Sequence, residues 1–198
     1  MTYNEIFSRN NIVANIPLVY EGRKLGKSEA ASVMLVRVAY ANKVQEYEKY
    51  MEDVLKGLKK EGFDERSQAI SEMENIDRRK KAAEDWKKGQ KDENGKPVEK
   101  PEMPTKEELE KAEKTRETKE EYDKELKELE EAYGEARKKH GEKDVKFDAK
   151  FTRAEYAEIC ELIGYEGDFE FSSIFTGGKE RVSKEMFLSF IAANLVAQ

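Results

Sequence analysis

The sequence predicts a mainly α protein in which a charged antiparallel helical hairpin projects from a small head of short helices and one or two short strands. Three observations predict this fold class. Charged residues make up 40% of the 198-residue chain, against roughly 25% in an ordinary globular protein. Apolar residues recur at helical spacing over long stretches. The aromatic residues gather near both ends of the chain, where a core can form.

The domain organisation follows from this uneven composition. Residues 56–146 hold 25 basic and 27 acidic side chains but only four aromatic ones. Residues 1–55 hold six aromatic side chains, and residues 147–198 hold nine. We therefore expect residues 1–55 and 147–198 to build the head together and residues 56–146 to form the charged hairpin. Residues 89–104 contain three prolines and should form the loop at its tip.

The N-terminal region is expected to begin with a short helix. Thr2 and Glu5 have the T-x-x-E spacing of a capping box, in which each side chain accepts from the other residue's backbone N–H. The apolar run at residues 16–20 contains Pro17, which has no N–H to donate to a sheet. It is therefore expected to be an edge strand or extended chain.

A long helix follows, for which Ser28 is a suitable N-cap and Gly62 a suitable end. Its apolar residues recur three or four positions apart, the strongest periodic signal in the chain. Leu35 and Val38 add a second apolar face, so we expect the first turns to be buried on several sides. The main stripe comprises Val33, Val36, Tyr40, Val44, Tyr47, Met51, Val54 and Leu58.

Two further helices form the expected hairpin, one over residues 64–88 and one over residues 105–141. Asp64 is a candidate N-cap for the first, and Thr105 with Glu108 has capping-box spacing at the start of the second. Acidic residues four positions before lysines support the second helix, each pair contributing about 0.2–0.5 kcal/mol. The apolar stripe of the second helix comprises Tyr122, Leu126, Leu129 and Tyr133.

The C-terminal region has a denser apolar pattern. Residues 145–151 alternate apolar and charged side chains, which predicts a half-buried strand. Thr152 and Glu155 form a third capping-box pair, opening a helix that ends at Gly164. Ser183 is the expected cap of a last helix.

Side chains that support catalysis or metal binding are scarce. The chain has one cysteine, Cys160, and one histidine, His140. Cys160 sits on an amphipathic helix and His140 in a basic helix-terminal turn, so no base is placed to activate the thiol. The motifs H-E-x-x-H and C-x-x-C do not occur. We therefore expect a protein that is not an enzyme and that holds no cofactor or metal ion.

One basic patch lies in the first hairpin helix. An aromatic side chain beside such a patch can stack on a nucleic-acid base. Acidic residues flank this patch, and the net charge of the chain is −6, so we expect nucleic acid to be a poor partner. The patch comprises Arg78, Arg79, Lys80 and Lys81, with Trp86 nearby.

Two apolar stripes longer than a compact head can cover point to protein–protein contact. They must cover each other or a neighbouring subunit, so we interpret the chain as a non-catalytic structural or assembly protein whose partners are protein subunits, copies of itself included. The alternative is a regulatory module that grips nucleic acid or a host protein with the hairpin. The interface candidates are Tyr40, Val44, Tyr47, Met51, Val54, Leu58, Tyr122, Leu126, Leu129 and Tyr133.

This layout resembles the small helical structural and accessory proteins of tailed-bacteriophage virions, in which helical hairpins pack between subunits of a ring, shell or scaffold. The resemblance rests on the Lys/Glu-rich helices of residues 56–146 and the aromatic-rich end at residues 147–198. It implies virion proteins as partners and assembly in a host cytoplasm. The first residues lack a signal-peptide pattern and the apolar runs are short, so we expect a cytoplasmic protein with no membrane partner.

Overall fold

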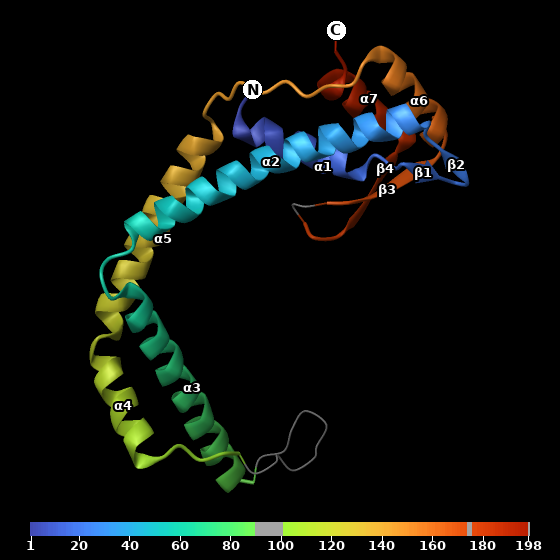
Figure 1. Ribbon diagram of the computed structural model, residues 1–198. Helices are drawn as coiled ribbons and strands as arrows, with labels where there is room; N and C mark the ends of the chain where they lie inside the picture. The colour runs from blue at the N-terminus through green and yellow to red at the C-terminus, as the bar shows by residue number, and fades with distance from the viewer. Residues whose placement is uncertain (90–100, 174–175, 198) are drawn as a thin grey trace. The chain divides into compact units, whose positions relative to one another are not determined.

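The computed structural model describes residues 1–89, 101–173 and 176–197, and it confirms a mainly α fold with a few short strands. These residues form seven helices and two antiparallel two-stranded sheets (Figure 1). They divide into two compact units. Unit 1 comprises Met1–Asp53 and Ala136–Gln198, and unit 2 comprises Val54–Glu135. Most of the predicted tip loop, residues 90–100, lies outside the described residues.

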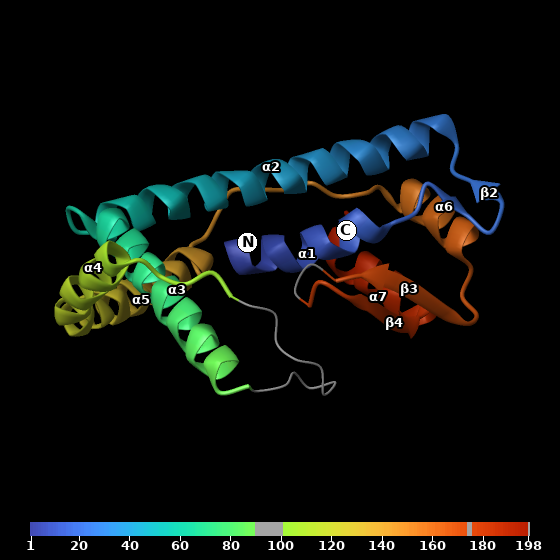
Figure 2. The same cartoon turned by 90° about the horizontal axis from the view of Figure 1, so that it is seen from below.

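Unit 1 joins both ends of the chain around one core. Figure 2 shows helix α1 (Tyr3–Asn15) between the first part of α2 (Lys27–Leu58) and helix α7 (Lys184–Leu195). Strands β1 (Val19–Tyr20) and β2 (Arg23–Lys24) form one small sheet. Helix α6 (Arg153–Ile163) packs on α7. The core includes the fully buried side chains of Ile6, Val13, Ile16, Tyr40, Phe151, Ile159, Ile191 and Leu195.

The capping boxes that the sequence predicts are present. The Thr2 hydroxyl accepts from the Glu5 backbone N–H at 3.3 Å, and Thr2 N–H donates to the Glu5 carboxylate at 2.6 Å. Thr105 at the start of α4 (Lys106–Glu117) and Thr152 at the start of α6 make the same reciprocal pair. Ser183 caps α7 through the Met186 N–H at 3.1 Å. These caps satisfy backbone donors that have no partner inside the helix.

Two other predicted caps are wrong. Helix α2 begins at Lys27, so Ser28 lies inside it. Helix α3 (Phe63–Lys87) begins at Phe63, with Gly62 as N-cap at a φ of 73°. Asp64 therefore falls in the first turn, where its carboxylate pairs with Lys59 at 2.6 Å. The left-handed backbone at Gly62 needs a residue without a Cβ, and this turn sets the helix start instead of an aspartate.

The predicted strand at residues 145–151 is also wrong. The segment is irregular, and only Phe151 forms a bridge, to Val196. Its backbone is tied instead by single contacts, such as Val145 N–H to the Met1 carbonyl at 2.8 Å. The C-terminal sheet pairs β3 (Asp168–Ser172) with β4 (Lys179–Ser183), and Phe169 lies opposite Val182. An alternating apolar and charged pattern alone does not distinguish an extended segment from a strand that pairs with a neighbouring strand.

Unit 2 is an antiparallel helical hairpin in which α3 packs along α4 and the first part of α5 (Lys119–Gly141). The helix predicted over residues 105–141 is broken at Thr118. There the Thr118 hydroxyl and backbone N–H both donate to the Thr115 carbonyl, at 3.0 and 3.1 Å. This local bonding competes with the regular helical pattern, which explains the break.

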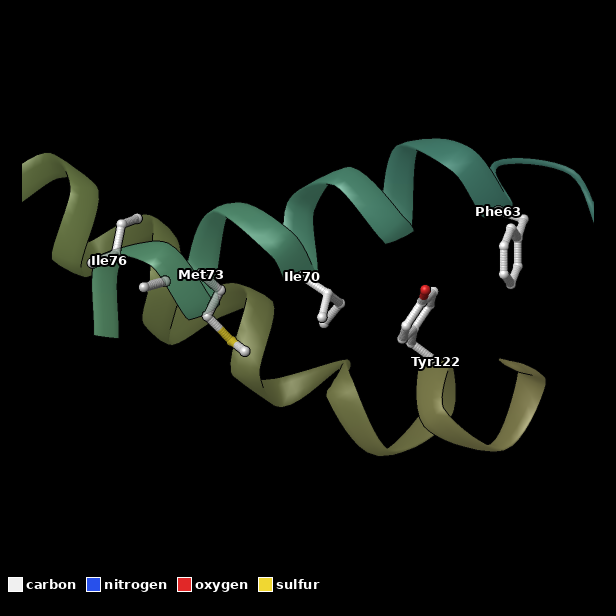
Figure 3. Packing of buried hydrophobic residues seen from close by; sticks show 6 residues of the cluster. Phe63, Ile70, Met73, Ile76 and Tyr122 are labelled. Atoms are coloured by element: carbon white, nitrogen blue, oxygen red, sulfur yellow. The ribbon is translucent and has the colours of Figure 1, made fainter. Parts of the chain in front are cut away.

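A small apolar cluster and a set of ion pairs hold unit 2 together. Figure 3 shows Phe63 facing Tyr122, with Ile70, Met73 and Ile76 along the same side of α3. The carboxylate of Glu125 accepts three hydrogen bonds from the Arg66 guanidinium, with a shortest distance of 2.8 Å. Further pairs cross the hairpin between Lys60 and Glu128, Lys119 and Glu74, Arg116 and Asp77, Lys111 and Glu72, and Arg79 and Glu108.

Candidate protein–protein interface

The inner face of α2 is fixed by aromatic contacts within unit 1. The Tyr47 ring lies 5.2 Å from that of Tyr3 and 4.9 Å from that of Phe7, the latter edge-on. The Tyr40 ring meets that of Phe147 edge-on at 4.8 Å. Such tilted and edge-to-face pairs contribute roughly 0.5–1.5 kcal/mol each beyond their buried area. They fix which side of α2 faces the core.

A half-buried arginine also sets the position of α2 against the end of α1. Arg37 Nε donates to the Val13 carbonyl at 3.2 Å, and its Nη2 donates to the Ile16 carbonyl. These carbonyls lie at the C-terminal end of α1, where backbone acceptors lack helical partners. Arg37 is the charge that interrupts the apolar run of residues 30–41, and its guanidinium is turned inward to the backbone.

Over residues 31–45, the opposite side of α2 is exposed and uncharged. With 3.6 residues per turn, Val38 lies roughly half a turn around the helix from both Val36 and Tyr40, which are buried. The side chains of Leu35, Val38 and Met34 are 72%, 51% and 46% exposed. We call this surface the α2 outer face; it comprises Ala31, Met34, Leu35, Val38, Ala41, Asn42 and Gln45.

This exposure corrects the expectation that the first turns of α2 are buried on several sides. The segments around α2 cover its inner face, and within the described residues Leu35 and Val38 remain on the surface. Single exposed apolar residues are ordinary, but a contiguous uncharged stripe over four helical turns is typical of an interaction surface. The sequence signal for this surface is a second apolar face on one helix, and that signal alone does not distinguish a buried face from an exposed one.

The interface candidates on α2 lie mostly inside the chain. Tyr40, Tyr47 and Met51 are buried, and Val44 and Val54 are half-buried. Leu58, the last residue of α2, keeps an exposed side chain. The main stripe of the long helix is therefore its inner face, and it leaves little surface for a second chain.

The interface candidates on α5 likewise pack within their own chain, in unit 2. Tyr122 is buried against Phe63, with ring centres 5.5 Å apart, and its hydroxyl lies 3.1 Å from the Ser67 hydroxyl. Leu126 and Leu129 pack on the same cluster, and Tyr133 is half-buried. The hairpin thus covers its own apolar stripe within a single chain.

The basic patch of α3 is partly neutralised by contacts within unit 2. Arg79 pairs with Glu108, and Arg78 Nε donates to the Glu74 carbonyl at 3.3 Å. The pKa of Glu108 is held below its usual range, first by the backbone N–H of its capping partner Thr105 and then by Arg79. Lys80 and Lys81 are exposed, and the Trp86 side chain is 38% exposed. The structure therefore leaves a weaker positive surface than the sequence pattern suggests.

Cys160 and His140 lie in different surroundings. Cys160 is buried on α6, and burial, followed by interaction with the Cys160 thiol, raises the pKa of Tyr156. His140 stacks on Tyr50 with ring centres 3.9 Å apart, and burial, with Lys143 nearby, lowers its pKa. No group of three or more metal-binding side chains occurs in residues 1–89, 101–173 and 176–197. Over the same residues, no helix combines the length and apolarity of a membrane span.

The α2 outer face is thus the feature that best fits a functional surface. It is built from one regular helix, its rotation is fixed by Arg37 and two tyrosines, and it exposes three large apolar side chains, Met34, Leu35 and Val38, on one stripe. No protein-family model, curated protein or solved structure matches the chain.

Proposed function

We propose that this chain is a non-catalytic structural or assembly protein that binds another protein subunit through the α2 outer face. The observation that carries the proposal is the exposure of Met34, Leu35 and Val38 on a chain whose residues are 40% charged. Full burial of one such side chain is worth about 1.5–3 kcal/mol. Because the three side chains are only 46–72% exposed in the free chain, a partner that covers all three gains about half of this value per side chain. That gain offsets part of the cost of association, about 4–15 kcal/mol.

The chemistry of the face favours protein over other partners. It presents no cation to phosphate groups and no ring of carboxylates to a metal ion. Its aliphatic side chains flank small residues, Ala31 and Ala41, that allow close approach of another helix or strand. Such a surface gains its free energy by excluding water, as protein contacts do at the centre of an interface.

Unit 2 fits the role of a solvated helical hairpin in such an assembly. Its apolar cluster is internal, and its surface is laced with ion pairs that join its helices. Exposed pairs of this kind add only about 0–1 kcal/mol each but keep a helical arm soluble. A virion ring, shell or scaffold, as the resemblance of the sequence implies, is a setting in which both units would be used. Nucleic-acid binding by α3 is less favoured, because Arg79 is committed to Glu108.

The proposal is tested by asking whether the α2 outer face is covered in the cell. Leu35→Cys places a reactive thiol on the face, whereas the native Cys160 is buried and gives little background. A membrane-permeant polar maleimide is applied to the dilute purified protein and to intact cells of the natural source. We expect labelling of position 35 in dilute solution and strong protection in cells.

Val19→Cys provides the matched control. Val19 is 54% exposed, close to the 51% of Val38, but lies in β1 and not on the outer face. It should react to the same extent in solution and in cells. Equal labelling of position 35 in both settings, with the control also unchanged, would show that the face meets only water and would overturn the proposed function.

A further inference from the structure

Unit 1 carries a second uncharged apolar surface, and it is concave. A cavity of about 200 Å³ opens between α1, the β3–β4 sheet and α7. We call it the α7 groove. Met186 and Phe190, one helical turn apart on α7, line it and are each 53% exposed. Its remaining apolar lining comes from Ile12, Phe171, Val182 and Phe187.

The α7 groove lacks charge in the same way as the α2 outer face. Ser8 and Asn11 of α1 also line it, and none of its lining residues carries a formal charge. A charged group that entered it would lose water without gaining a partner, at a cost of several kcal/mol. The groove therefore selects an aliphatic or aromatic side chain presented on an uncharged surface.

The two surfaces lie on opposite sides of unit 1. Helix α1 separates α2 from α7 and the β3–β4 sheet (Figure 2). The inner face of α2 contacts α1 through Tyr47, so the outer face points away from it. One copy therefore presents a convex apolar ridge on one side and a concave apolar groove on the other.

We propose that the α7 groove of one copy binds the α2 outer face of a second copy, so that chains associate head to tail. This inference rests on the proposed function and identifies the partner as another copy of this chain. Leu35, which protrudes most from the face, enters the groove, and Val38 and Met34 cover its rim formed by Met186 and Phe190. The contact is heterologous, because two different surfaces meet, and such contacts build rings or open filaments.

The volume of the groove, the lack of charge on both surfaces and the number of surfaces covered all favour a second copy of the chain as the occupant. An apolar cavity of about 150 Å³ holds a benzene-sized molecule, so a groove of about 200 Å³ accommodates a leucine side chain. Neither surface places a charge in the contact. A two-fold pairing of α2 with α2 would leave every groove open, whereas a closed head-to-tail ring covers one ridge and one groove on every copy.

The experiment uses the full chain with each surface broken in turn. Leu35→Glu damages the outer face and leaves the groove intact, and Phe190→Glu does the reverse. Sedimentation velocity over a concentration series measures association. We expect the native chain to form species larger than a dimer and each variant alone to associate at least about tenfold more weakly.

Mixing the two variants gives the decisive readout. The intact groove of Leu35→Glu can bind the intact outer face of Phe190→Glu, so the mixture should form one-to-one dimers that grow no further. Met186→Glu serves as a second groove variant, and Val19→Glu is the control that should associate as the native chain does. Circular dichroism verifies that each variant remains folded, as expected for side chains that are at least half exposed in the native chain.

Each other outcome overturns the inference. Association of Phe190→Glu and Met186→Glu at native strength, with Leu35→Glu monomeric, would show two-fold pairing of α2. A native chain that stays monomeric at every concentration would exclude self-association. If position 35 were nevertheless protected in cells, the proposed function would stand with a different protein as partner, so the two failures are distinguishable.

Discussion

Unit 1 and unit 2 solve the problem of stability in different ways. Unit 1 brings together segments more than a hundred residues apart and fully buries aromatic and aliphatic side chains such as Phe151 and Ile191. Unit 2 buries a short row of apolar side chains and joins its helices by ion pairs such as Arg66–Glu125. Apolar burial is worth much more per side chain than an exposed ion pair.

The same difference separates the surfaces of the two units. Unit 1 has apolar residues beyond those its core uses, and they appear as the α2 outer face and the α7 groove. Unit 2 places its main apolar residues in its internal cluster and surrounds them with charge. An excess of apolar surface favours association. We therefore propose unit 1 as the site of protein contact, although the sequence pattern also predicts interface residues on the hairpin.

The largest expected effect concerns the core of unit 1. Phe151→Ala removes a ring that is fully buried, and we expect the free energy of unfolding of unit 1 to fall by about 3–5 kcal/mol. Phe190→Ala removes the same ring from a position that is 53% exposed and should cost far less. Urea denaturation followed by near-ultraviolet circular dichroism measures both. Equal losses would mean that the exposed ring is packed as tightly as the buried one.

The next effect concerns the ion pairs of unit 2. Glu125 is 12% exposed and accepts a bidentate contact from Arg66, so Glu125→Gln should destabilise unit 2 by about 1 kcal/mol. Glu131→Gln breaks a pair with Lys127 at 4.0 Å that is almost fully solvated, and it should have no measurable effect. Hydrogen exchange of α3 amides reports the difference. A loss that persists unchanged in molar salt would argue against an electrostatic origin.

Local signals predicted the ends of several elements well. The capping pairs at Thr2, Thr105 and Thr152 are all present because their hydrogen bonds span only three residues and need no tertiary partner. The α5 stripe also lies on the inner side of its helix, as its spacing indicates. By contrast, the left-handed turn at Gly62 and the break at Thr118 depend on short loop conformations that periodicity does not encode.

The candidate surface could be predicted only in part. Leu35 and Val38 were visible as a second apolar face, but whether such a face is buried depends on how many segments the fold brings to α2. The α7 groove was not predictable, because it is formed by α1 and by the β3–β4 sheet, which are distant in sequence. Surfaces made of several segments exist only once the tertiary contacts are known.

A smaller effect compares one motif in both units. Thr105→Ala and Thr152→Ala each remove an N-cap hydrogen bond, at a cost of about 1 kcal/mol. Helix α6 is held by buried residues such as Ile159 and Ile163, whereas α4 buries only Ala112 among its described residues. Hydrogen exchange should therefore accelerate in the first turns of α4 more than in those of α6. The reverse order would show that α4 is fixed by contacts other than its cap.

The smallest expected effect is a pH dependence of unit 1 that arises from His140. Its ring stacks between Tyr50 at 3.9 Å and Tyr3 at 5.0 Å, and burial, with the positive charge of Lys143, lowers its pKa from the usual value. The folded state therefore favours the neutral ring. The stability that this provides is complete above the unfolded pKa of about 6.5 and is lost as pH falls through the folded pKa.

His140→Phe keeps an aromatic ring at this position but removes the titration. Acidification from about pH 7.5 to about pH 5.5 should lower the urea midpoint of the native chain more than that of the variant. Glu5 and Glu155, whose pKa values are lowered chiefly by hydrogen bonds, titrate below this range and affect both proteins alike. The tyrosine faces also attract a cation. If that attraction exceeded the cost of burial, the native chain would gain stability on acidification relative to the variant. The packing of α5 against α1 and α2 would then be explained by a charged imidazolium held between aromatic rings.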